Sequence, residues 1–256
     1  MADPIEDQQQ PQVKQATIIL VSRNREVELE AALDAIQAAT NRDALEVIVM
    51  DNGSSDNTIA LREKYNETIT FLKLPKNYGW VKAVNIALRS AHAEFILLAD
   101  PTVRFEKDAI AKLIAALESS PEASAVVPQL LNTSGEPANF TRDLPAPGNL
   151  RPPLRQPAAS ETTLAFPSFQ AFLVRMTFLR GMNFLDQRFG DSWADAEICF
   201  QINHAGKKIL WAKDAKATVG PGVPPLEAES LGGSRFHPGC GYLSSQALGR
   251  CERFAV

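Results

Sequence analysis

Three groups of polar residues each follow an apolar run of the sequence, and their chemical types are those of a ligand site. Ser22-Arg23-Asn24 follows ATIILV, Asp51 follows LEVIVM, and Asp100 follows EFILLA. Hydroxyl, amide and carboxylate groups bind polar ligands, and a carboxylate can hold a hard cation. A single Asp after a strand is usually a turn former, so the prediction of a site depends on the three groups occurring together.

The hydrophobic period of the chain predicts the elements that position these groups. Apolar runs without polar alternation are typical of strands buried on both faces, and apolar residues at i, i+4 and i+7 are typical of amphipathic helices. Strands are predicted at 16–21, 45–50, 68–74 and 94–99, and helices at 25–39, from Thr58, at 79–90 and at 109–117. This alternation predicts a Rossmann-like, doubly wound α/β fold with a mostly parallel sheet and helices on both faces. In such folds ligands bind beyond the carboxyl ends of the strands.

The second half of the chain is less regular. A long segment at 132–163 is rich in Pro, Gly, Ser and Arg and predicts a loop. The other features are a strand at 125–131, ordered segments at 166–174 and 179–184, a helix at Ala194–His204, short strands at 209–211 and 217–219, a Gly- and Pro-rich stretch at 220–241, and a helix-like end at 242–254. We therefore expect a disordered polar tail at 1–15 and a single domain at 16–256.

Charge and composition exclude several classes of protein. The 256 residues contain 26 Lys and Arg against 30 Asp and Glu, a net charge of −4 without a basic block, so nucleic acid is not an expected partner. Cys199, Cys240 and Cys251 form no Cys-x-x-Cys pair and indicate no disulfide framework. The apolar runs are far shorter than the ~20 residues of a spanning helix, and the N-terminus lacks a secretory signal pattern. We expect a cytoplasmic protein without a membrane span, which is compatible with peripheral association.

Several common catalytic motifs are missing from the sequence. The turn at 22–25 lacks the glycines of a dinucleotide-binding turn, and there is no P-loop, no Gly-x-Ser-x-Gly and no His-Glu-x-x-His. Tyr78 and Lys82 have the Tyr-x-x-x-Lys spacing of short-chain dehydrogenases, but the pattern is weak without the glycines. An α/β oxidoreductase is therefore disfavoured.

Four strings of the sequence resemble a known family. They are TIILVSRNREVELEAALDAI, VIVMDNGSSDNT, LPKNYGWVKAVNIALRSAHAEFILLADPTVRFEKDAI and AFLVRMTFLRGMNFLDQRFGDSWADAEICFQINHAGKKILWAKDAKATV. Together they resemble family 2 inverting glycosyltransferases, which have the GT-A fold, and the rhamnosyltransferase-like branch fits best. The resemblance covers about Ala16 to Val219. It implies a nucleotide-binding half at 16–131 and an acceptor half with variable loops at 132–256.

The resemblance implies a donor site at the strand ends. Asp51 matches the aspartate that accepts a hydrogen bond from the pyrimidine ring, and Asn77 with Gly79 matches an Asn-x-Gly element beside the nucleotide. Asp100 stands in the metal-binding motif, so the implied cofactor is Mg²⁺ or Mn²⁺. Further implied donor contacts are at Ser22, Arg23 and Asn24.

The resemblance places the general base on Asp195, which would act on the acceptor hydroxyl. The implied reaction is a single displacement with inversion, which moves a sugar from a nucleoside diphosphate to a glycan or lipid-linked acceptor. Rhamnosyl transfer in cell-surface polysaccharide synthesis is one such reaction. Asp191 belongs to the preceding turn and Glu197 to a different helix face, so neither is the expected base.

The sequence departs from the family pattern around the implied metal site. Thr102 stands at a metal-coordinating aspartate, Ala194 replaces the acid before the general base, and Gly220 replaces a histidine. These losses leave metal-independent transfer as an alternative.

Other residues of the chain could take the place of the missing metal ligands or of the metal, and the sequence is also compatible with a different function. His237 could complete the metal site, or Arg23 or Lys82 could supply fixed positive charge. The rival from another class is a non-catalytic GT-A-like module that binds or scaffolds.

Overall fold

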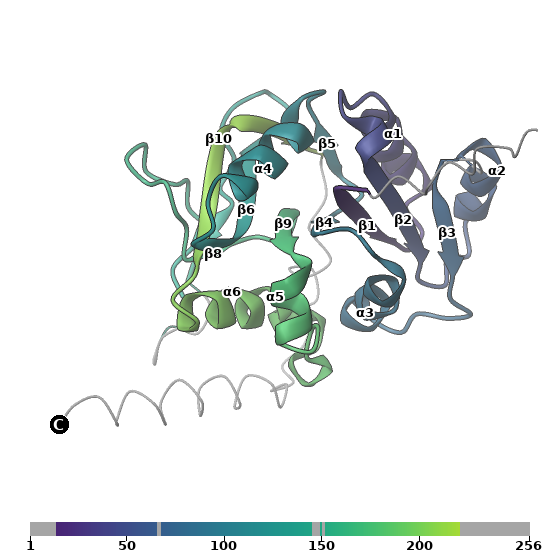
Figure 1. The fold of residues 1–256 in the computed structure, drawn as a ribbon. Coiled ribbons are helices and arrows are strands. Elements are labelled where there is room, and N and C mark those ends of the chain that lie inside the picture. Colours follow the sequence, from purple (N-terminus) through teal and green to yellow (C-terminus); the bar gives the residue numbers. More distant parts are fainter. Residues whose placement is uncertain (1–13, 66–67, 145–148, 150–151, 221–256) are drawn as a thin grey trace, which may run out of the picture.

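The computed structural model describes residues 14–65, 68–144, 149 and 152–220. They form a single α/β domain on one curled, mostly parallel sheet of eight strands, in the order β3-β2-β1-β4-β9-β6-β10-β5 (Figure 1). The strands are β1 (Ala16–Ser22), β2 (Leu45–Asp51), β3 (Thr70–Lys73), β4 (Phe95–Ala99), β5 (Val103–Phe105), β6 (Ala123–Leu131), β9 (Ala171–Arg175) and β10 (Lys208–Val219). The predicted α/β class is confirmed.

Strand β1 lies inside the parallel half of the sheet. It pairs in parallel with β2 and with β4, in registers that set Ser22 beside Asp51 and Leu20 beside Ala99. The three strands are buried along nearly their whole length, as their unbroken apolar sequences predict. Their parallel pairing brings the polar residues that follow each strand to one edge of the sheet.

Two strands run against the others. β9 pairs antiparallel with β4 and β6, and β5, which the sequence patterns do not reveal, pairs antiparallel with β10. The two short strands expected at 209–211 and 217–219 are parts of β10. The sequence prediction divides this strand because Lys213, Asp214 and Lys216 interrupt its apolar pattern. The structure accommodates them with a register shift against β6 between Ala212 and Lys216.

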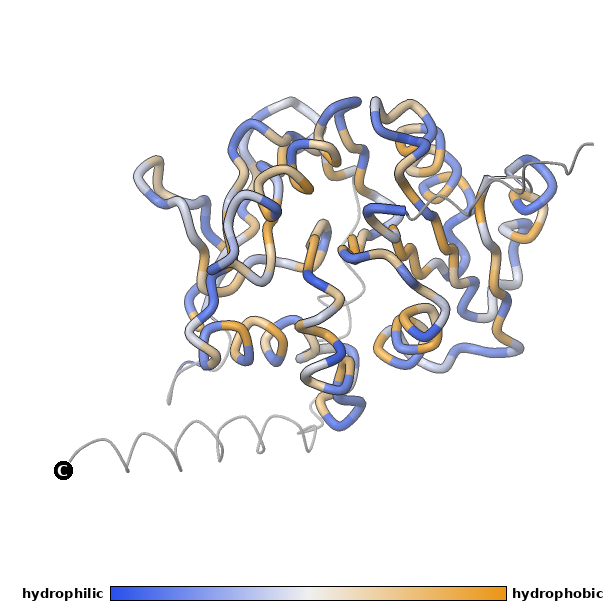
Figure 2. Tube along the Cα trace, in the orientation of Figure 1, coloured by the Kyte–Doolittle hydropathy of each residue, from blue (hydrophilic) through white to orange (hydrophobic). Residues whose placement is uncertain are grey.

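Helices cover both faces of the sheet. Figure 1 shows α1 and α4 on one side and α3, α5 and α6 on the other. Figure 2 shows apolar residues concentrated on the strands and on the helix sides turned toward them. The helices are α1 (Glu26–Gln37), α2 (Leu61–Tyr65), α3 (Trp80–Ser90), α4 (Ala109–Glu118), α5 (Met176–Gly181) and α6 (Ala194–His204), with 3-10 turns at Arg42–Ala44, Asn57–Ala60, Gln187–Phe189 and Asp191–Trp193.

The long loop expected at 132–163 contributes to a small second sheet. Within 132–163 the described residues contain one short strand, β7 (Thr141–Arg142), which pairs with β8 (Phe166–Pro167) in a separate two-stranded sheet. Most of the tail expected at 1–15, and nearly all of the chain from 220 to the helix expected at 242–254, lie outside the described residues. Within the described ranges, none of the helices has the length and apolar character needed to cross a bilayer.

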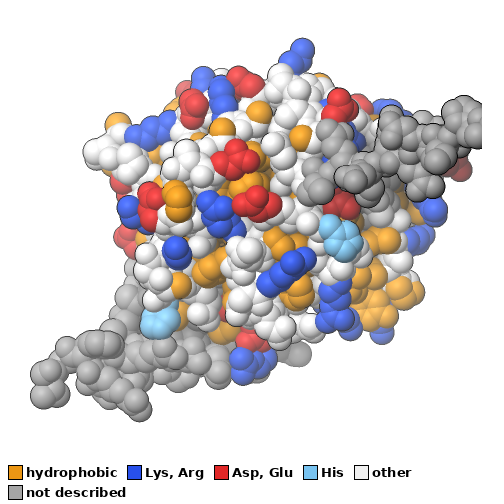
Figure 3. Space-filling view, viewed as in Figure 1, with side chains coloured by type: hydrophobic (Ala, Val, Ile, Leu, Met, Phe, Trp, Pro, Cys, Tyr) orange, Lys and Arg blue, Asp and Glu red, His pale blue; other side chains and the backbone are white. Residues whose placement is uncertain are grey.

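Surface charges of both signs are mixed. Figure 3 shows Lys and Arg side chains scattered among Asp and Glu on the face it displays, with no continuous basic area. A nucleic-acid backbone binds through clustered basic groups. This face therefore offers no site of that kind.

The buried side of α1 gives a test of the fold. Leu29 is fully buried, whereas Val27, two positions earlier in the same helix, is 76% exposed. We expect Leu29→Ala to lower the free energy of unfolding by about 2–5 kcal/mol, since it leaves a cavity, and Val27→Ala to change it by less than about 0.5 kcal/mol. Urea unfolding measures both variants, and equal losses would contradict this placement of α1.

Candidate functional site

The ends of β1 and β2 hold two buried polar side chains side by side. Ser22 and Asp51 are register partners, with 1% and 2% of their surface exposed. The backbone N–H of Ser54 donates to Oδ1 of Asp51 at 2.8 Å. Oδ2 of Asp51 and Oγ of Ser22 have no hydrogen-bond partner within the described part of the chain. Because buried polar atoms are nearly always satisfied, this pair marks a place where a ligand could supply the missing donor.

Asn24 ties the turn after β1 to the turn after β2. Its φ of 53° lies in the left-handed region, which Asn tolerates. Its backbone N–H donates to Oγ of Ser54 at 3.0 Å, and its Oδ1 accepts from the N–H and hydroxyl of Ser55 at 2.8 and 3.2 Å. Asn24 therefore orders the loop around Asp51, while the neighbouring Arg23 is exposed on the same turn.

Asn52, which the sequence patterns do not single out, orders the turn before α3. Its Nδ2 donates to Oδ1 of Asn77 and its Oδ1 accepts the N–H of Tyr78, both at 2.9 Å. Oδ1 of Asn77 also accepts the N–H of Gly79 at 2.9 Å, and the φ of 86° at Gly79 lies where glycine is favoured. The structure thus brings Asn77 and Gly79 against the end of β2. The signal for Asn52 is its place directly after Asp51.

Asp191 connects the first and second halves of the chain. Its Oδ1 accepts the backbone N–H of Val81, in the first turn of α3, at 2.9 Å. A Cβ built on Gly79 would lie 2.9 Å from Oδ2 of Asp191, so glycine leaves room for this contact. A carboxylate is favourable at the N-terminal end of a helix. Asp191 therefore holds the segment before α6 against the Asn77–Gly79 turn, a link that its place in a turn does not predict.

Asp100, which follows β4, is held by its own turn and by one guanidinium. Its Oδ1 accepts the backbone N–H of Thr102 at 2.8 Å and the hydroxyl of Thr102 at 2.6 Å. Nη1 of Arg25 lies 3.3 Å from each of the two carboxylate oxygens. Both Asp100 and Thr102 are buried, and Arg25 is the residue that precedes α1. The result is a carboxylate fixed from two sides at the edge where Ser22 and Asp51 lie.

The structure places Arg25 beside Asp100, rather than Arg23 or Lys82. Arg23 is exposed, and Nζ of Lys82 lies over the ring of Tyr78, 4.5 Å from its centroid. His237 lies outside the described residues. The signal for Arg25 is its position in the same polar turn after β1.

The described residues do not assemble a site for a divalent cation. Among them there is no group of three or more His, Cys, Asp or Glu side chains that could hold a metal. The Thr102 hydroxyl is used on Asp100, and Gly220 offers only a backbone N–H, which donates to the carbonyl of Thr102 at 2.8 Å. Mg²⁺ and Mn²⁺ need several oxygen ligands, whereas Asp100 would offer one carboxylate that already contacts Arg25. This donor set does not fit either ion.

Two buried acids lie in the first turn of α6. Oδ1 of Asp195 accepts the N–H of Ala196 at 2.8 Å. Glu197 is 4% exposed, its Oε1 accepts from Nε2 of Gln201 at 3.4 Å, and its Oε2 has no hydrogen-bond partner among the described residues. Burial raises the pKa of Glu197 to about 7. Both acids are therefore buried, so burial does not show which of the two is functional, and mutagenesis has to decide.

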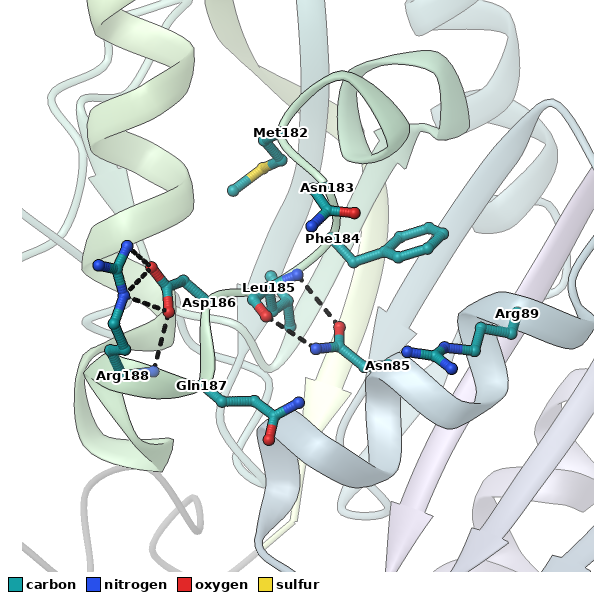
Figure 4. A pocket seen from close by; sticks show the side chains of 9 residues that line it. All are labelled: Asn85, Arg89, Met182, Asn183, Phe184, Leu185, Asp186, Gln187 and Arg188. Atoms are coloured by element: carbon teal, nitrogen blue, oxygen red, sulfur yellow. Dashed lines mark hydrogen bonds and ion pairs between the residues drawn. The ribbon is translucent and has the colours of Figure 1, made fainter.

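A pocket of about 680 Å³ lies between α3 and the segment before α6 (Figure 4). Asn85 fixes this segment, because its Nδ2 donates to the carbonyl of Leu185 at 2.7 Å and its Oδ1 accepts the N–H of Leu185 at 3.1 Å. Asn183 and Phe184 have positive φ values of 60° and 64°. The walls are Asn85, Arg89 and residues 182–188, which include none of the site residues predicted from the sequence.

The chain is similar in sequence to glycosyltransferases. The family described as Glycosyl transferase family 2 matches residues 17–182. The uncharacterized glycosyltransferase YfnE of Bacillus subtilis (strain 168) is 30% identical over 106 residues, which are 41% of this chain and 27% of that protein. The poly-beta-1,6-N-acetyl-D-glucosamine synthase of Staphylococcus aureus (strain COL) is 28% identical over 122 residues, 46% of this chain and 29% of that protein. The aligned regions thus make up less than a third of each of these relatives.

Several solved structures share the fold. GalNAc-T7 with UDP, GalNAc and Mn²⁺ has a TM-score of 0.69 at 15% identity, over 83% of this chain and 45% of that one. The mannosyltransferase PcManGT from Pyrobaculum calidifontis, in complex with GDP-Man and Mn²⁺, has a TM-score of 0.64 at 19% identity, over 92% and 70%. S. aureus TarS 1–349 in complex with UDP-GlcNAc has a TM-score of 0.64 at 17% identity, over 94% and 73%. These similarities establish the GT-A fold.

The buried acid Glu197 predicts a dependence of stability on pH. Its pKa rises from 4.5 to about 7 on folding, so the folded state binds more protons than the unfolded state between these values. The free energy of unfolding should therefore fall as the pH rises from 4.5 to 7 and then level off. Glu197→Gln removes this loss and should be more stable than the wild type by about 3 kcal/mol at pH 8.

Urea unfolding of both proteins between pH 4.5 and 8 measures this difference. The variant and the wild type should have similar stabilities at the acidic end and diverge above it. A constant difference at every pH would contradict the raised pKa of Glu197.

Proposed function

Since the chain belongs to glycosyl transferase family 2, we propose that it transfers a sugar from a nucleoside diphosphate donor to a hydroxyl of a glycan or lipid-linked acceptor. The observation that carries this proposal is the pair of buried oxygens, Oγ of Ser22 and Oδ2 of Asp51, that lack a partner at two adjacent strand ends. The carboxyl edge of a doubly wound sheet is where ligands of such folds bind. The donor would occupy this edge.

The base of the donor is proposed to lie against Asp51. A carboxylate is an acceptor only, so Oδ2 suits the imide N–H of a pyrimidine such as uracil or thymine. Ser22 can donate or accept through its hydroxyl beside it. The turn at Asn77 and Gly79, which Asn52 holds in place, would line the nucleotide where a missing side chain allows close approach. Arg23 and Asn24 would border the ribose from the turn after β1.

Asp195 is the proposed general base for the acceptor. In a single displacement the acceptor oxygen forms a bond to the anomeric carbon while the bond to the diphosphate oxygen breaks. The acceptor proton passes to Asp195, and the diphosphate leaves with the electron pair, so the anomeric centre inverts. A base in this role typically contributes ~10²- to 10⁴-fold in rate.

The class of donor is supported by the fold neighbours, which hold UDP, GDP-Man and UDP-GlcNAc. The resemblance of the chain to the rhamnosyltransferase-like branch makes a nucleotide-linked rhamnose the first sugar to try. The family neighbour that makes poly-beta-1,6-N-acetyl-D-glucosamine supports a polysaccharide or its precursor as acceptor.

The transfer proposal predicts that Asp195→Asn loses turnover. A carboxamide cannot accept the acceptor proton, so release of nucleoside diphosphate should fall by about 10²-fold or more. The assay measures diphosphate released from a panel of UDP-, dTDP- and GDP-linked sugars, in which water can replace the acceptor. Glu197→Gln, two residues after Asp195 in α6, is the matched variant and should keep turnover.

Two results would contradict this assignment. Loss of turnover in Glu197→Gln with retention in Asp195→Asn would move the base to Glu197. A wild-type protein that binds a nucleoside diphosphate but releases none from any donor would favour the non-catalytic module instead. Circular dichroism of both variants controls for folding.

A further inference from the structure

Arg25 contacts Asp100, the carboxylate to which the sequence resemblance assigns a metal. Asp100 follows β4, and Arg25 lies in the turn that follows β1, the neighbouring strand. Nη1 of Arg25 is 3.3 Å from both oxygens of the Asp100 carboxylate. The guanidinium brings N–H donors to the edge of the sheet at which Oγ of Ser22 and Oδ2 of Asp51 lack a partner among the described residues.

We propose that Arg25 is the positive group that binds the donor's diphosphate, so that this chain binds its nucleotide without a divalent cation. The inference deepens the proposed function and rests on it. The cation would otherwise serve to neutralise the charge of the departing diphosphate. Arginine can serve the same purpose, because its planar fork of N–H groups matches phosphate oxygens.

The carboxylate of Asp100 is arranged to hold a guanidinium rather than a metal ion. Thr102 donates two hydrogen bonds to Oδ1, from its backbone N–H and its hydroxyl, and so fixes the carboxylate. Thr102 stands where the family pattern has a second acid, and threonine adds no negative charge there. A divalent cation needs more anionic ligands than this one carboxylate, which interacts electrostatically with both Arg25 and Arg104.

Arg25 retains hydrogen-bonding capacity for a ligand. Within the described ranges its side chain contacts Asp100 through Nη1, and its Nε and Nη2 make no hydrogen bond there. The side chain is 19% exposed, so it is partly accessible from the solvent. Asp100 thus orients Arg25 and leaves its Nε and Nη2 groups available to an anion.

Binding of nucleoside diphosphates to the full chain tests the inference. UDP, dTDP and GDP are titrated calorimetrically in EDTA and in Mn²⁺. We expect the wild type to bind at least one of them with dissociation constants that agree within about threefold in the two conditions. Arg25→Ala should weaken binding in EDTA by about 10- to 100-fold, since it loses charge-assisted hydrogen bonds.

Three variants sharpen the result. Arg25→Lys keeps the charge without the fork and should bind between the wild type and Arg25→Ala. Arg62→Ala removes an exposed arginine on α2 and should bind like the wild type. Arg25→Ala combined with Thr102→Asp restores the family's acidic pair and should bind better in Mn²⁺ than in EDTA. Thermal unfolding of each variant shows whether it is folded.

The possible results distinguish a failure of the role proposed for Arg25 from a failure of the transferase proposal. Wild-type binding that requires Mn²⁺, or binding in EDTA that Arg25→Ala leaves unchanged, overturns the role of Arg25 while the transferase proposal stands. No binding of any diphosphate in either condition overturns both. Metal-independent binding that is lost in Arg25→Ala supports the inference.

Discussion

The parallel pairing of β1 with both β2 and β4 is the constraint on which the rest of the site depends. It sets the ends of three buried strands at one edge and so brings Ser22, Asp51 and Asp100 together from positions far apart in the sequence. A slip of one residue in this register would turn every side chain of a strand to the other face of the sheet. The apolar faces of β1 and β2 therefore fix the site as well as the core.

Burial of the polar atoms at this edge costs desolvation free energy, and hydrogen bonds and ion pairs offset that cost for some of them. Asp100 would be an uncompensated charge without Thr102 and Arg25, and an unpaired buried carboxylate destabilises a fold strongly. Oδ2 of Asp51 and Oγ of Ser22, by contrast, have no such compensation from the described residues. The described residues thus contact both oxygens of Asp100, whereas they leave one oxygen of Asp51 without a partner, as the proposed donor-binding role of Asp51 requires.

Patterns of apolar residues along the sequence predict the strands and helices that form from residues close together in the chain. The apolar runs locate β1, β2 and β4, and helical spacing locates α6 at Ala194–His204. The strand ends in turn indicate where Asp51 and Asp100 lie. Contacts between distant segments are not visible in this way: the placement of Asp191 against α3 spans 110 residues, and β5 is too short to carry a period. Arg25 is missed because its role depends on which of two arginines in one turn reaches Asp100.

A crystal structure of the chain with UDP, grown in EDTA, would show which groups hold the nucleotide. We expect the uracil N–H against Oδ2 of Asp51 and diphosphate oxygens on the guanidinium of Arg25, without a metal ion between them. UDP bound elsewhere, for example in the pocket between Asn85 and Arg188, would contradict the account. So would a diphosphate at this edge that leaves Arg25 untouched.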